Sequence, residues 1–156
     1  MLTLHIITVG KDKDSWITDQ IAHYRTILSR YARLEMTTVA EAKYTKNTDL
    51  KRALAGEADA IEGKLQGGFL VVLDVKGRSF STELLAKEIS RIQVSGVSTI
   101  EWVIGGPFGL HDRLKEKADL LFSLSPLTLS HQITRVVLLE QLYRVLNLNA
   151  GGSYHK

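Results

Sequence analysis

The sequence contains no cysteine, and this absence excludes several kinds of chemistry together. Without a thiol the chain forms no disulfide, carries no thiolate nucleophile and supplies no sulfur ligand to zinc or an iron–sulfur cluster. Nothing therefore indicates an oxidising compartment, and we expect a cytoplasmic protein. Only two prolines occur, and the chain shows no repeat, no low-complexity tract and no linker. Its 156 residues predict one domain spanning residues 1–156.

Long hydrophobic runs and familiar catalytic motifs are also missing. The longest unbroken apolar run is Phe69–Leu73, far short of the ~20 residues that a membrane helix needs, and no signal-peptide pattern is visible. We therefore expect no contact with a membrane. The five histidines form no H-x-x-x-H pair, so we expect no metal site. The sequence has no G-x-S-x-G, G-x-G-x-x-G or Gly-Lys-Ser/Thr motif, which argues against a serine hydrolase and the usual phosphate loops.

The charge balance is mild, but the charges are unevenly distributed. Twenty basic residues against seventeen acidic ones give a net charge of +3. From residue 125 to residue 156 the only acid is Glu140, so the C-terminal segment is locally cationic. A second basic cluster consists of Lys43, Lys46, Lys51 and Arg52. Taken alone, such clusters are more often solvent-exposed surface than nucleic-acid contacts, so other observations must decide between these two interpretations.

Apolar periodicity alternates between strand and helix along the chain. Apolar runs predict strands over residues 2–9, 34–39, 69–73, 99–104 and 120–124. Helical spacing predicts helices over residues 17–31, 48–61, 81–92, 112–118 and 131–148, with Asn47 or Thr48 as a cap of the second. The central run 69–73 is apolar on both faces, as in a strand covered by helices on each side. We therefore expect an α/β fold with a parallel-rich sheet flanked by helices.

The predicted final helix carries a wider apolar surface than packing against one sheet requires. Its apolar residues are Ile133, Val136, Val137, Leu138, Leu139, Leu142, Val145 and Leu146. They cover more than the ~100° stripe that faces a single neighbour. Either a second copy of the chain covers the second face, in a homodimer, or the helix is simply deeply buried.

Three turns follow strands of the expected sheet, and ligands of open α/β sheets bind beyond the carboxyl ends of the strands. The turns are residues 74–77, 105–109 and 125–130. Glycines at 105, 106 and 109 leave space for close backbone approach to a ligand and permit positive φ. We expect the three turns to face one pocket, although glycine-rich turns of this kind are also common as purely structural features.

The chain ends in Tyr154, His155 and Lys156, which follow a break in the last helix. A phenol, an imidazole and an ammonium group can stack on or hydrogen-bond to a nucleobase and its phosphate. The alternative is a frayed terminus without a function.

Several separated segments resemble one known family. They read LDVKG at 73–77, IGGPFGL at 104–110, LSPLTLSHQ at 124–132, RVVLLEQLYR at 135–144 and YHK at 154–156. Together they resemble the RlmH family, small bacterial enzymes of the SPOUT superfamily that use S-adenosylmethionine to methylate N3 of a pseudouridine in 23S ribosomal RNA. The resemblance spans the whole chain.

This resemblance implies a homodimer and a C-terminal trefoil knot. It also implies that the three turns form the pocket for S-adenosylmethionine. Cofactor-binding positions carried over from the family are Leu73, Gly105, Leu124, Ser125, Pro126, Leu127, Thr128 and Leu129. Our own hypothesis is that Tyr154 or His155 orients or deprotonates the base, while Arg135, Arg144 and Lys156 hold RNA phosphates. The functional alternative is a non-catalytic α/β module that binds a nucleotide or RNA.

Overall fold

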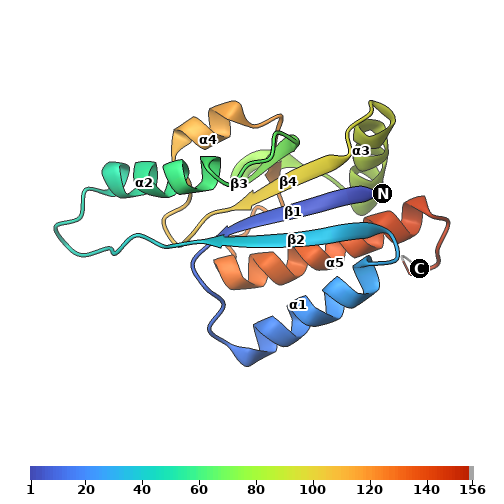
Figure 1. The fold of residues 1–156 in the computed structure, drawn as a ribbon, viewed down its shortest axis with the longest axis horizontal. Helices are drawn as coiled ribbons and strands as arrows, with labels where there is room; N and C mark the ends of the chain where they lie inside the picture. The colour runs from blue at the N-terminus through green and yellow to red at the C-terminus, as the bar shows by residue number, and fades with distance from the viewer. Residues whose placement is uncertain (155–156) are drawn as a thin grey trace.

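Five parallel strands form the sheet that the periodicity predicts, in a computed structural model that describes residues 1–154 (Figure 1). The spatial order is β2-β1-β4-β3-β5, and each neighbouring pair runs parallel. The strands are β1 (Leu2–Val9), β2 (Ala32–Val39), β3 (Phe69–Ser79), β4 (Thr99–Ile104) and β5 (Leu120–Ser123). Because all five point the same way, their last residues meet at one edge of the sheet, which we call the carboxyl edge.

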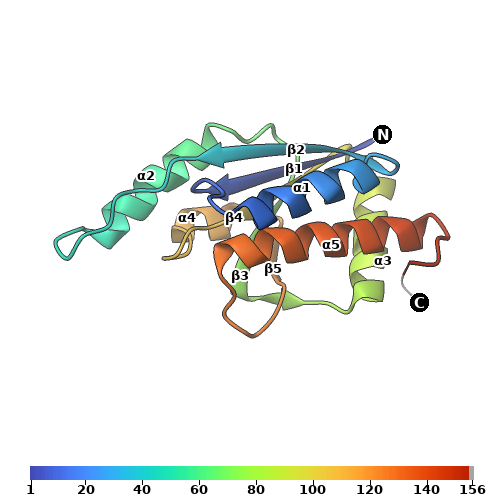
Figure 2. The same cartoon turned by 90° about the horizontal axis from the view of Figure 1, so that it is seen from below.

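Helices cover both faces of the sheet (Figures 1 and 2). The helices are α1 (Ser15–Leu28), α2 (Leu50–Glu62), α3 (Thr82–Val94), α4 (Asp112–Lys117) and α5 (His131–Asn149). Apolar side chains of α1, α3 and α5 build one core against the sheet, and those of α2 and α4 build a second core on the opposite face. Strands buried on both faces account for the near-continuous apolar runs.

Short polar side chains fix where three of the helices begin. Asp49, Ser81 and Ser130 each accept a hydrogen bond from a backbone N–H in the first turn of α2, α3 and α5, respectively. The cap of α2 is thus Asp49, whereas the sequence suggested Asn47 or Thr48. The Thr48 hydroxyl instead accepts a hydrogen bond from the Thr45 amide at 2.7 Å and closes the preceding turn.

Strand β3 runs further than its apolar pattern indicates. The sequence predicts a strand that ends at Leu73 and a turn after it, but β3 continues to Ser79. Leu73 and Arg78 both pair with Phe122 of β5, so residues 74–77 form an irregular bulge within the strand. Gly77 is required there, because a Cβ would lie 2.6 Å from the backbone carbonyl carbon of Phe122.

Helix α5 lies between α1 and α3 and packs on both of them (Figure 2). Its buried apolar residues are Leu138, Leu139, Leu142, Val145 and Leu146. Among its large apolar residues, Ile133 is the one with an exposed side chain. Neighbours within the same chain therefore cover most of the wide apolar surface, so deep burial within one chain, the alternative to a dimer, accounts for most of it.

Candidate functional site

A cavity of about 470 Å³ opens at the carboxyl edge of the sheet. Its walls come from the bulge of β3, the glycine turn after β4, the loop after β5 and the first turn of α5. The residues lining it are Leu73, Asp74, Val75, Ile104, Gly105, Gly106, Pro107, Gly109, Leu110, Phe122, Ser123, Leu124, Ser125, Thr128, Leu129, Ser130, His131 and Thr134. The prediction that the segments 74–77, 105–109 and 125–130 face one pocket is confirmed, although residues 74–77 form a bulge within β3 and not a turn after it.

The loop after β5 is shaped by its own hydroxyl groups. The Ser123 hydroxyl donates a hydrogen bond to the Ser125 carbonyl oxygen at 3.0 Å, and the Ser125 hydroxyl accepts one from the Leu127 amide at 3.0 Å. The Ser130 hydroxyl accepts a hydrogen bond from the Ile133 amide and starts α5. These bonds fix the conformation of the loop, whose residues Ser125, Thr128 and Ser130 line the cavity together with the strand ends.

Gly105 is required by the conformation of its own turn. A Cβ at this position would lie 2.8 Å from the Gly109 carbonyl oxygen and 2.8 Å from Cγ of Leu110. Gly109 closes the turn at φ +79°, and its amide donates to the Gly106 carbonyl oxygen at 3.0 Å. The glycine pattern suggested a ligand close to this backbone, but the close neighbours of Gly105 in this structure are backbone and side-chain atoms of the turn.

The eight expected cofactor-binding positions divide into two groups. Six of them line the cavity, namely Leu73, Gly105, Leu124, Ser125, Thr128 and Leu129. Pro126 and Leu127 do not, and the Leu127 side chain is 69% exposed. Sequence reasoning missed His131 and Thr134, which face the cavity from the first turns of α5. Their position directly after the predicted loop was the available signal.

Two ionisable side chains in the cavity have shifted pKa values. Burial lowers the pKa of His131 below its ordinary value, and the nearby Arg135 cation lowers it further, so the imidazole is neutral at pH 7. For Asp74, burial raises the pKa, but the Lys115 ammonium at 2.8 Å and the Lys76 amide outweigh it and leave the pKa below its ordinary value. The cavity therefore presents a neutral imidazole and a carboxylate that is already paired.

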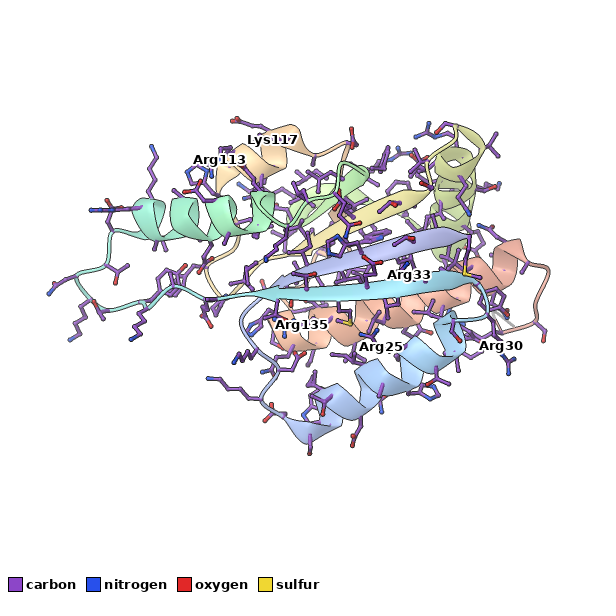
Figure 3. The ribbon with its side chains drawn as sticks, viewed as in Figure 1. Arg25, Arg30, Arg33, Arg113, Lys117 and Arg135 are labelled. Carbon is purple, nitrogen blue, oxygen red and sulfur yellow. The ribbon has the colours of Figure 1, made fainter. Side chains whose placement is uncertain are left out.

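Arg135 lies in the interior, beneath the sheet (Figure 3). Its guanidinium donates to the carbonyl oxygens of Val9 at 2.7 Å and Gly10 at 2.8 Å and pairs with Asp12. With 1% of the residue exposed, it has no surface on which to meet an RNA phosphate. The expected phosphate contact therefore does not fit this position: Arg135 ties the start of α5 to the end of β1.

A second expected RNA contact, Arg144, lies toward the far end of α5. Arg144 pairs with Glu140, donates to the Tyr154 carbonyl oxygen at 3.2 Å and places its guanidinium 4.7 Å from the centre of the Tyr154 ring. The Tyr154 amide donates to Asn147 at 3.0 Å, and its ring packs edge-on against Tyr143. Tyr154 is thus ordered against the helix and is 42% exposed. His155 and Lys156 lie outside the described residues.

Within one chain, Tyr154 and the cavity are far apart. Thr134 lines the cavity, whereas Asn147, which holds Tyr154, lies thirteen residues further along the same helix. At 1.5 Å per residue this corresponds to about 20 Å. Figure 1 shows the same separation, since α5 begins at the carboxyl edge and ends beside the N-terminus at the opposite edge.

Residues 1–154 show neither a grouped metal site nor a membrane-spanning helix. In that range no three histidine, aspartate or glutamate side chains are grouped so as to hold a metal ion. No helix described there has the length and apolar character that crossing a membrane requires.

Comparison with known proteins adds independent evidence. A family model described as "Predicted SPOUT methyltransferase" matches residues 2–155. A protein named ribosomal RNA large subunit methyltransferase H from Leuconostoc citreum is 36% identical over 99% of this chain and 100% of its own length. A protein of the same name from Bifidobacterium adolescentis is 37% identical over the same shares.

Solved structures share the fold at much lower identity. A probable methylase family protein from Haemophilus influenzae has a TM-score of 0.58 at 13% identity, covering 100% of this chain and 72% of that one. A tRNA methyltransferase from Aquifex aeolicus has a TM-score of 0.54 at 14% identity, covering 92% and 70%. The family match and the full-length relatives bear out the resemblance of the sequence motifs, and they show that this chain belongs to the SPOUT methyltransferase family, in its ribosomal RNA large subunit methyltransferase H branch.

Proposed function

We propose that this protein uses S-adenosylmethionine to methylate N3 of a pseudouridine in 23S ribosomal RNA of the large subunit. The observation that carries the proposal is the cavity at the carboxyl edge, which is built by the motifs at 73–77, 104–110 and 124–132 that tie the chain to its family. A ribosomal substrate also implies a cytoplasmic protein.

The cavity suits S-adenosylmethionine in size and in chemistry. Its volume of about 470 Å³ lies within the ~300–1,000 Å³ typical of small-molecule sites. The strand ends supply apolar walls for an adenine ring, and the loop after β5 supplies hydroxyl and backbone groups for the ribose and the amino acid. We assign the binding to Leu73, Gly105, Leu124, Ser125, Thr128 and Leu129, with Pro126 and Leu127 shaping the outer part of the loop.

Bound in this cavity, S-adenosylmethionine supplies a methyl group on a sulfonium, which is already strongly electrophilic. The protein therefore has to position the acceptor nitrogen and receive the proton of the imide N3–H. His131 lines the cavity, and its lowered pKa keeps it unprotonated at pH 7, so it is able to accept that proton. By our hypothesis, Tyr154 or His155 from the tail orients the base or deprotonates it.

The tail acts on a second subunit in this proposal. Because about 20 Å of α5 separates Asn147 from Thr134, Tyr154 does not reach the cavity of its own chain. An antiparallel pairing of two α5 helices would bring the tail of each chain to the cavity of its partner. We therefore propose a homodimer with shared sites, and with it the trefoil knot expected for this family.

A methyl-transfer assay tests the function. Purified protein, tritium-labelled S-adenosylmethionine and large subunits or whole ribosomes that carry the pseudouridine should give labelled 23S RNA, and the same particles with uridine at that site should give none. Label that appears equally on both would show that the isomerised base is not recognised. Calorimetric binding of S-adenosylmethionine without any transfer would instead favour a non-catalytic module.

Mixing tests the shared site. A Gly105→Val chain has a damaged cavity, and a chain lacking residues 153–156 has no tail. If the sites are shared, each should be inactive alone, and the mixture should regain activity because mixed dimers contain one complete site. A mixture that stays inactive, although mass measurement shows mixed dimers, would contradict the sharing.

A further inference from the structure

The second basic cluster of the sequence is not used by the site described so far. It lies in the segment between β2 and α2 and in the first turn of α2, residues 40–52, which we call the basic arm. This segment extends beyond the carboxyl edge of the sheet and is seen in profile in both views (Figures 1 and 2). The basic arm therefore stands on the same side of the molecule as the mouth of the cavity.

The cations of the basic arm are free to meet a ligand. Lys43, Lys46, Lys51 and Arg52 are all exposed, and none of them forms an ion pair within residues 1–154. On α4 the basic residues are engaged instead: Arg113 bonds Asp59 and Glu62, and Lys117 bonds Glu62 (Figure 3). Four basic residues against Glu41 and Asp49 leave the arm with an excess of two positive charges.

The electrostatics of α2 also favour an anion at this place. Lys51 and Arg52 stand in the first turn of the helix, which contains no acidic residue. The amino end of a helix carries a partial positive charge, so two cations there are unfavourable, and the single carboxylate of the cap residue Asp49 offsets only part of their charge. A phosphate of an RNA backbone, which carries one negative charge, would offset part of this positive charge.

The basic arm is held in place by a buried carboxylate. Glu57 of α2 is 4% exposed, and its Oε1 accepts hydrogen bonds from the Ala42 amide at 2.9 Å and from the Tyr44 hydroxyl at 2.8 Å. The Tyr44 ring packs on Phe108 with 4.3 Å between ring centres. Phe108 belongs to the glycine turn that lines the cavity, so the arm is fixed relative to the site of methyl transfer.

We infer that the basic arm is an RNA-docking surface, in which Lys43, Lys46, Lys51 and Arg52 bind phosphates of ribosomal RNA beside the mouth of the cavity. The Phe108 ring is 53% exposed next to the arm and offers a face for an unpaired base. Cations with an exposed aromatic ring are typical of surfaces that bind single-stranded RNA. This inference rests on the proposed function and adds the element that positions its substrate.

The test compares two pairs of lysines. Lys46→Gln with Lys51→Gln removes two charges from the arm, and Lys64→Gln with Lys87→Gln removes two exposed charges elsewhere. Each phosphate that a lysine no longer neutralises reduces the slope of log affinity against log salt by about 0.7–0.9. Removing the neutralisation of two phosphates therefore weakens binding to large subunits roughly 25- to 60-fold at ~0.1 M salt.

Filter binding to large subunits and to protein-free 23S RNA, together with the kinetics of methyl transfer, gives the readouts. We expect the arm variant to bind large subunits and free 23S RNA more weakly than wild type, and its affinity to depend less steeply on salt. Its KM for the RNA substrate should rise, whereas its kcat and its calorimetric affinity for S-adenosylmethionine should stay unchanged. The control variant should match wild type in every measurement. Equal binding by the two variants would overturn the inference, and weaker binding to subunits but not to free RNA would assign the arm to a protein partner. A wild-type protein that binds RNA through the arm but transfers no methyl group would refute only the proposed function.

Discussion

Arg135 offers the sharpest test of the structure, because its burial contradicts a role on the RNA surface. Arg135→Met keeps the aliphatic bulk but removes the bonds to the carbonyl oxygens of Val9 and Gly10 and the pair with Asp12. Breaking a buried charge pair by removing one partner destabilises a protein by about 3–5 kcal/mol. For a domain of this size that is a fall in Tm of about 6–20 °C.

Urea unfolding followed by tryptophan fluorescence measures this effect, since Trp102 is 1% exposed in the core that α5 completes. Arg33→Met is the matched control: its side chain is 73% exposed, and its ion pair with Glu35 lies at the surface, where such pairs contribute about 0–1 kcal/mol. Protein concentration is kept constant, because a dimer unfolds at a concentration-dependent midpoint. If Arg135→Met were as stable as wild type and lost RNA affinity instead, the guanidinium would be a phosphate ligand and the interior position would be wrong.

Four further predictions concern the site and the assembly. Gly105→Val should abolish binding of S-adenosylmethionine in calorimetry, because its Cβ overlaps Gly109 and Leu110 and displaces the turn; unchanged affinity in a folded variant would remove this turn from the pocket. Deleting residues 153–156 should lower kcat on the order of 10²-fold, while the free energy of unfolding changes by no more than about 1 kcal/mol and cofactor affinity is preserved. If the truncated enzyme kept the full-length rate, the proton acceptor would have to be His131 or solvent. Because the folded-state pKa of His131 lies below 6.5, the protein should lose stability as pH falls from 6.5 through that pKa, and His131→Gln should flatten this part of the unfolding curve. Light scattering should give the mass of a dimer, and Ile133→Asp, at an exposed apolar position of α5, should shift it toward a monomer; a monomeric wild type would end the shared-site model.

The sequence predicts those features that depend on local pattern. The predicted bounds of β1 and β4 match the structure, and a glycine follows each strand directly, Gly10 after Val9 and Gly105 after Ile104. The clustering of the three turns also follows from sequence, since parallel strands bring their carboxyl ends to one edge. The order of the strands and the covering of α5 by α1 and α3 do not follow from any local pattern.

Features set by distant contacts escape the same reasoning. Arg135 reads as a surface residue because charged side chains are seldom buried, yet its partners lie more than one hundred residues away at 9–12. The bulge in β3 depends on its pairing with Phe122 of β5. The conformation of residues 105–109 depends on the close contacts of Gly105 with Gly109 and Leu110. Pro126 and Leu127 share a motif with residues that line the cavity, and only the curvature of the loop turns them outward.

The order of the strands has a consequence for how the chain is made. β1 and β2 are neighbours both in the sequence and in the sheet, but β4 fills the place between β1 and β3, and β5 lies on the other side of β3. At about 5–20 residues per second, the ~30 residues between the apolar run of β3 and the end of β4 take roughly 2–6 s to synthesise. During that interval an apolar strand and one edge of β1 have no partner. A nascent chain that pauses before residue 104 therefore leaves this apolar strand and this edge of β1 unpaired.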